Sequence, residues 1–130
     1  MTVQGAQVGS TVLQRQVGPD RLVFVLFRKF MITVVDLGAT NLPAVCHVLH
    51  KQGVDLDVVD QPEDLEDASA LILPWSGPLE AGCKILADTG LGDAIVEAVA
   101  AGRPLLGLSG GAYLLAETLP SGDAGLGLLP

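Results

Sequence analysis

Basic residues are scarce in this sequence, which has 7 Lys and Arg against 15 Asp and Glu and a net charge of −8. Four of those basic residues lie in residues 1–30, so this segment has a net charge of +3 and residues 31–130 have a net charge of −11. Such an acidic body would repel phosphate backbones, which argues against nucleic acid as a partner.

Metal-binding and disulfide patterns are also missing. The two cysteines, Cys46 and Cys83, stand far apart without a C-x-x-C motif, so we expect reduced thiols in a cytoplasmic protein. His47 and His50 lie three residues apart on a predicted helix, but no third ligand follows at a suitable spacing. We therefore expect no metal and no cofactor.

The longest purely apolar run near the N-terminus, "LVFVLF" at 22–27, has six residues. A membrane span needs about 20 apolar residues, and a signal peptide also has a longer apolar region. The sequence therefore predicts a soluble chain without a membrane partner.

Apolar segments are abundant, because 49% of the residues are hydrophobic and only 17% are charged. Short apolar runs alternate with helical patterns, which indicates an α/β fold with a parallel sheet covered by helices on both faces. We expect strands at 31–36, 54–60, 70–74 and 104–109, and helices at 41–52, 60–68 and 112–119. A further helical region is expected after residue 82, and its best part is 93–101. Residues 75–82 and 120–130 are predicted to be loops.

Several residues mark the expected ends of these helices. Asn41 is a suitable N-cap with Pro43 just after it, and Gly102 is a suitable stop. Asp60 and Glu63 resemble a capping box. The acidic residues that follow predict a solvated helix face; they are Glu63, Asp64, Glu66 and Asp67.

Residues 1–30 differ from the rest of the chain. The run at 22–27 has the composition of a strand with two apolar faces, so we expect it to add to this chain's sheet or to a neighbour's. The alternative is that residues 1–30 have no role in the fold. An open sheet edge after the fourth strand of the body predicts a homo-oligomer.

The stretch Gly107-Leu108-Ser109-Gly110-Gly111 fits G-x-S-x-G, a sharp turn from strand to helix that exposes a nucleophile. A serine nucleophile needs a positioned base, and no histidine follows Ser109 in the sequence. The glycines have a second explanation, since they also permit close approach of strand and helix. Asp36 ends the first strand at the edge where open α/β sheets bind ligands, or serves only to hydrogen-bond the following turn.

Four stretches from Met31 onward resemble the class I glutamine amidotransferases, and among them the glutaminase subunits of imidazole glycerol phosphate synthase. They are "VVDLGATNLPAV", "LILPWSG", "GRPLLGLSGGAYLLAE" and "GLGLLP". The resemblance covers residues 31–130 and implies a flavodoxin-like half-domain that is truncated at its C-terminus, with residues 1–30 as an extension.

The resemblance also implies a reaction and a partner. In that family a cysteine attacks glutamine, a histidine acts as base, a glutamate orients the histidine, and ammonia passes to a cyclase barrel subunit. Ser109 stands at the position of the cysteine. The oxyanion and substrate loop corresponds to Pro74, Trp75, Ser76, Gly77 and Gly110.

This sequence departs from the family pattern at three points. Ser109 replaces the more nucleophilic cysteine, and Trp75 replaces a glycine in the oxyanion loop. The family's histidine and glutamate lie beyond the last residue, Pro130. We therefore expect a catalytically inactive relative, with Trp75 either packing over the strand ends or forming a substrate platform. The alternative is a non-catalytic interaction module.

Overall fold

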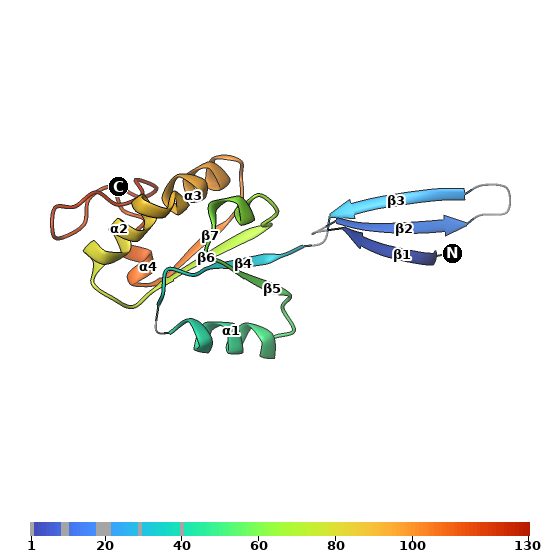
Figure 1. The fold of residues 1–130 in the computed structure, drawn as a ribbon, viewed down its shortest axis with the longest axis horizontal. Helices are drawn as coiled ribbons and strands as arrows, with labels where there is room; N and C mark the ends of the chain where they lie inside the picture. The colour runs from blue at the N-terminus through green and yellow to red at the C-terminus, as the bar shows by residue number, and fades with distance from the viewer. Residues whose placement is uncertain (1, 9–10, 18–21, 29, 40) are drawn as a thin grey trace.

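The computed structural model describes residues 2–8, 11–17, 22–28, 30–39 and 41–130. Residues 31–130 form a parallel sheet with the strand order β5-β4-β6-β7 (Figure 1). Its strands are β4 (Ile32–Val35), β5 (Leu56–Val59), β6 (Ala70–Trp75) and β7 (Leu105–Ser109). The helices are α1 (Leu42–Lys51), the 3-10 helix η1 (Pro62–Leu65), α2 (Leu79–Thr89), α3 (Leu91–Ala100) and α4 (Gly110–Tyr113).

The predicted α/β class is confirmed, with helices on both faces of the parallel sheet. Figure 1 shows α1 on one side of the sheet and α2 and α3 on the other. On the side of α2 and α3, alternate strand residues form the main core with apolar residues of the helices. Val35, Leu71, Leu73, Leu91 and Ile95 are all at most 1% exposed. Burial of each such side chain contributes about 1.5–3 kcal/mol, so this face holds the domain together.

The first helix, α1, lies where the pattern predicts it, after Asn41 and with Pro43 in its first turn. The Asn41 side chain makes no capping hydrogen bond, although the residue stands at the N-cap position. Gly53, with φ of 72°, follows the C-cap and lets the chain leave the helix. No residue of α1 is fully buried, so this helix is held less tightly than α2 and α3.

The predicted loop at 75–82 is wrong from residue 79 onward, and the helical region predicted after it, with its best part at 93–101, is divided in two. The structure has two helices, α2 and α3, because Pro78 is already the N-cap of α2. Gly90, with φ of 78°, ends α2 and stands at the N-cap of α3, a left-handed conformation that favours glycine. The glycine and proline residues at 77–82 therefore mark a helix start as well as a loop.

The predicted capping box at Asp60 and Glu63 is also wrong. The short helix η1 begins after Gln61, which makes no side-chain capping hydrogen bond. Pro62 stands at its first position, where the missing N–H does no harm. The helix ends at Leu65, so it is shorter than the predicted helix at 60–68.

The predicted helix at 112–119 ends early, at Tyr113. The carbonyl oxygens of Leu114 and Leu115 accept hydrogen bonds from the N–H groups of Leu126 and Leu128, each at 2.8 Å. These carbonyls would otherwise accept bonds within a longer helix. The tail therefore folds back and replaces the last turns of the helix.

The N-terminal strands β1 (Thr2–Val8), β2 (Thr11–Val17) and β3 (Leu22–Arg28) form a separate antiparallel sheet in the order β1-β2-β3. The expectation that the run at 22–27 joins the parallel sheet of this chain is therefore wrong. β3 pairs along its whole length with β2, from Thr11↔Arg28 to Val17↔Leu22, so this hairpin partner satisfies one side of its backbone. Addition of the run to a neighbour's sheet stays a prediction. Within the described part of the chain, the helices are too short or too polar to cross a membrane.

Candidate functional site

The turn at Ser109 connects β7 to α4 and has an unusual backbone conformation. Ser109 has φ of 56° and ψ of −126°, and among the described residues other than glycine it alone has a positive φ. Such a conformation costs about 1–3 kcal/mol and persists only where the surrounding structure enforces it. The serine side chain is exposed at the end of the strand.

Three glycines let this turn pack tightly, Gly107 against α4 and Gly110 and Gly111 against β6. A Cβ atom at Gly107 would lie 2.7 Å from the Cα of Ala112, and one at Gly110 would lie 2.9 Å from the Trp75 carbonyl oxygen. A Cβ atom at Gly111 would overlap the carbonyl oxygen of Leu73. Close packing of strand and helix therefore requires glycine at these positions, whatever chemistry takes place there.

The parallel register places the expected oxyanion loop beside Ser109. Trp75 is paired with Ser109 and Pro74 with Leu108, although these residues lie far apart in sequence. Pro74 is buried within the sheet, whereas Ser76 and Gly77 are exposed just beyond the strand end. The fold thus brings the predicted nucleophile position and the predicted loop together.

Trp75 is the last residue of β6 and not a loop residue, and its side chain is only 6% exposed. Its indole Nε1–H donates a 2.9 Å hydrogen bond to the carbonyl oxygen of Pro78. The ring lies so close to Gly77, Gly82 and Gly110 that a Cβ atom on any of them would come within 3.1 Å of it. These contacts agree with a packing role for Trp75 and leave little exposed ring for a ligand.

Among the described residues, neither histidine lies on the elements that form this turn, β7 and α4. The Ser109 side chain makes no capping hydrogen bond, and His47 and His50 are exposed on α1. Across the described residues, no group of three or more His, Cys, Asp or Glu side chains is arranged to hold a metal ion. Just after β4, the Asp36 carboxylate accepts a 2.7 Å hydrogen bond from the backbone N–H of Gly38. Asp36 therefore hydrogen-bonds the turn that follows it.

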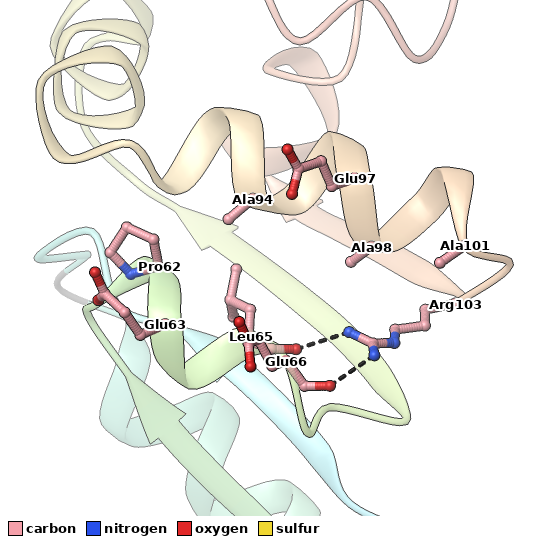
Figure 2. A pocket seen from close by; sticks show the side chains of 9 residues that line it. All are labelled: Pro62, Glu63, Leu65, Glu66, Ala94, Glu97, Ala98, Ala101 and Arg103. Atoms are coloured by element: carbon pink, nitrogen blue, oxygen red, sulfur yellow. Dashed lines mark hydrogen bonds between the residues drawn. The ribbon is translucent and has the colours of Figure 1, made fainter.

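Arg103 has a structural role that the sequence alone did not indicate. Its guanidinium donates to the carbonyl oxygens of Leu65, at 2.9 Å, and Glu66, at 2.6 Å, and so joins the start of β7 to the end of η1 (Figure 2). A hollow of about 590 Å³ lies between η1 and α3 beside this contact. The carboxylates of Glu63 and Glu97 at its rim are exposed, so we assign this hollow no binding role.

Cys83 lies in α2 beside a second hollow, of about 370 Å³, that is also lined by Gly125 and Leu126 of the tail. Burial raises the pKa of the Cys83 thiol, and the negative charges of Asp123 and Glu80 raise it further. The thiol is therefore protonated at neutral pH and is a weak nucleophile.

Comparison with known proteins agrees with this geometry. Over 100 residues, the chain is 37% identical to the imidazole glycerol phosphate synthase subunit HisH of Nostoc punctiforme, with 76% of this chain and 47% of that protein covered. A crystal structure of a glutamine amidotransferase superimposes with a TM-score of 0.66 and 26% identity, covering 75% of this chain and 52% of that one. The chain resembles the class I glutamine amidotransferases.

A structure of a putative peptidase E protein from Listeria monocytogenes has a TM-score of 0.67 at 16% identity, which indicates a shared fold. The superposition covers 77% of this chain and 63% of the peptidase E chain. No family model matches the sequence. The chain spans about half the length of the curated relatives it matches, between 44% and 48%.

Proposed function

We propose that this chain is the nucleophile-bearing half of a glutamine amidotransferase domain related to the HisH subunit of histidine biosynthesis, and that by itself it does not hydrolyse glutamine. The observation that carries the proposal is the strained turn at Ser109, paired with Trp75 within the region that is similar to HisH. A strained turn from strand to helix that exposes its side chain is the geometry of a nucleophile elbow, and this supports the proposal.

The chemistry at the turn supports the second part of the proposal. A serine hydroxyl attacks an amide only when a base removes its proton, and the departing ammonia also needs a proton. The Ser109 side chain makes no capping hydrogen bond, and both histidines are exposed on α1. The indole of Trp75 also packs against Gly110, beside the turn.

Ammonia release from glutamine tests this proposal. We expect no release above the buffer rate from the chain, from Ser109→Ala or from Ser109→Cys, because the cysteine restores a nucleophile but not the base. Release that Ser109→Ala abolishes would contradict the proposal. A gain of more than about 10³-fold in Ser109→Cys would also contradict it, since that gain would require a base within the chain.

A second candidate function is that of a non-catalytic interaction module. It is favoured by the exposed apolar side chains of Val48 and Leu106, which lie on the α1 side of the parallel sheet. The partner suggested by the family resemblance is the cyclase barrel subunit, and a homo-oligomer is the alternative. Capture of the cyclase subunit by the tagged chain, compared with sedimentation of the chain alone, distinguishes these two partners.

A further inference from the structure

The outer edge of β5 is open on the side away from β4. In the sheet order β5-β4-β6-β7, β4 is the one neighbour of β5 among the described strands. The carbonyl oxygens of Asp55 and Val59 accept hydrogen bonds from backbone N–H groups of β4 and of the residue that follows it. Because parallel strands alternate the direction of these groups, Leu56 and Val58 direct their backbone N–H and C=O groups to the open edge.

The stretch that contains this edge is strongly acidic. Residues 54–67 include seven acidic residues and no basic residue, and all seven acidic side chains are exposed. Asp57 belongs to the edge strand itself and lines a hollow of about 290 Å³ together with Glu63, Asp64 and Asp67. Acidic side chains on an edge strand repel another acidic strand, so this edge is suited to a basic one.

The strand β3 also has an open edge. In the order β1-β2-β3, β2 is its one neighbour among the described strands. Its sequence consists of the six apolar residues 22–27 and Arg28, with Arg21 directly before it and Lys29 directly after it. An apolar edge strand with no charge or proline in its interior pairs readily with another strand. β3 therefore combines an unprotected edge with basic residues at both of its ends.

The charges of the two open edges are complementary. Residues 1–30 have a net charge of +3, and residues 54–67 have a net charge of −7. In either strand direction, pairing of β3 with β5 brings the basic ends of β3 near Asp55 and Asp60, which flank β5. Two copies of β3 would bring like charges together. The edge strand β7 contains no acidic residue and is preceded by Arg103, so β5 is the better partner for β3.

The two edges that pair come from different copies of the chain. Within one copy, the described strands form two sheets, and β3 is not paired with β5. Residues 29–31 alone connect β3 to β4. A strand beside the open edge of β5 would lie about 10 Å from β4, at two strand spacings. A connection of this length is too short to cross that distance and also reverse the chain, so β3 reaches the β5 edge of another copy more easily.

We propose that β3 of one copy adds to the open edge of β5 in a second copy, with the basic ends of β3 held by the acidic stretch 54–67. A reciprocal exchange gives each copy the β3 strand of the other and closes the assembly as a dimer. This inference goes beyond the proposed function and does not depend on it, because strand pairing requires neither glutamine nor a catalytic base.

Sedimentation of the full chain over a series of concentrations tests this proposal. We expect a dimer, and association that is weaker by about tenfold or more in Val58→Pro, because proline removes the N–H that faces the open edge. The hydrogen bonds between β5 and β4 do not use this N–H. Val58→Ala is the matched control, since it keeps the N–H, and its association should stay within about threefold of the parent. A monomeric parent chain, or a dimer that Val58→Pro leaves intact, would overturn the proposal.

A charge reversal covers the case in which Val58→Pro does not fold. Asp57→Lys and Glu117→Lys change the net charge by the same amount, and both acidic side chains are exposed. Asp57→Lys should weaken the dimer by about tenfold or more, because it places a like charge beside the basic ends of β3. Glu117 lies in the chain after α4, away from β5 in sequence, and Glu117→Lys should not weaken the dimer. Equal weakening by the two substitutions, or no weakening by Asp57→Lys, would overturn the proposal.

Discussion

The two faces of the parallel sheet differ in how completely they are covered. On the face covered by α2 and α3, Leu73 is fully buried and Trp75 is 6% exposed. On the α1 face, Leu106 of the neighbouring strand is 53% exposed. The two faces have similarly apolar sequences, so apolar composition alone does not show which face is closed. What differs is the number of helices available to cover each face.

The two faces of the sheet contribute differently to the stability of the domain. The face covered by α2 and α3 contains the main core. The α1 face buries Val34 and Ile72 in the middle of the sheet but leaves Leu106 of β7 half exposed. Substitutions on the two faces should therefore have different consequences.

The largest expected effect is on the covered face. Leu73→Ala should lower the free energy of unfolding by about 2–5 kcal/mol, because it leaves a cavity in the core. Leu106→Ala is the matched control on the adjacent strand, and it should change stability by no more than about 0.5 kcal/mol. Denaturant unfolding of both variants measures the difference, and equal losses would mean that the α1 face is as important for folding as the covered face.

A smaller effect on stability is expected at the turn that connects β7 to α4. Ser109→Gly should raise the free energy of unfolding by about 0.5–2 kcal/mol, because glycine relieves a strain of about 1–3 kcal/mol and loses part of this gain to its greater unfolded-state entropy. Ser109→Ala keeps the Cβ atom and should stay within about 0.5 kcal/mol of the parent. Thermal or denaturant unfolding tests this, and destabilisation by the glycine would show that the serine side chain makes a stabilising contact.

The smallest expected effect compares the two cysteines, one on each side of the sheet. In a Cys46→Ser background, the ultraviolet absorbance of the thiolate should show a Cys83 pKa above the ordinary cysteine value, since burial and the charges of Asp123 and Glu80 oppose ionisation. The Cys83 thiol then ionises at a lower pH in the unfolded chain than in the folded chain. The contribution of Cys83 to stability is complete below the ordinary pKa and is lost as the pH rises through the raised folded-state pKa.

Adding Cys83→Ser to that background should remove this loss of stability at alkaline pH. The comparison requires unfolding curves for the single and double variants on both sides of the ordinary cysteine pKa. If both variants lose stability equally as the pH rises, the slope belongs to other groups.

The α/β class, the four parallel strands and the position of α1 follow from the alternation of apolar runs with helical patterns. The failed predictions have local causes. Pro78 starts α2 although it lies in a glycine-rich stretch, and the tail hydrogen-bonds to Leu114 and Leu115 and so ends α4 early. Single-segment patterns do not report such long-range hydrogen bonds.

The turn of the candidate site was predictable, because G-x-S-x-G marks the turn at Ser109, and the "LILPWSG" stretch marks the strand end beside it. The buried position of Trp75 was harder to predict from the sequence, because it depends on three glycines that make room for the indole. The role of Arg103 depends on backbone carbonyls of residues 65 and 66, and no local pattern points to these acceptors.

The strand order β5-β4-β6-β7 has a consequence for how the domain is made on the ribosome. β4 is synthesised first, β5 and β6 join its two sides, and β7 then joins β6, so each new strand pairs with one that has already emerged. The parallel sheet can therefore grow outward during translation without inserting a late strand between earlier ones.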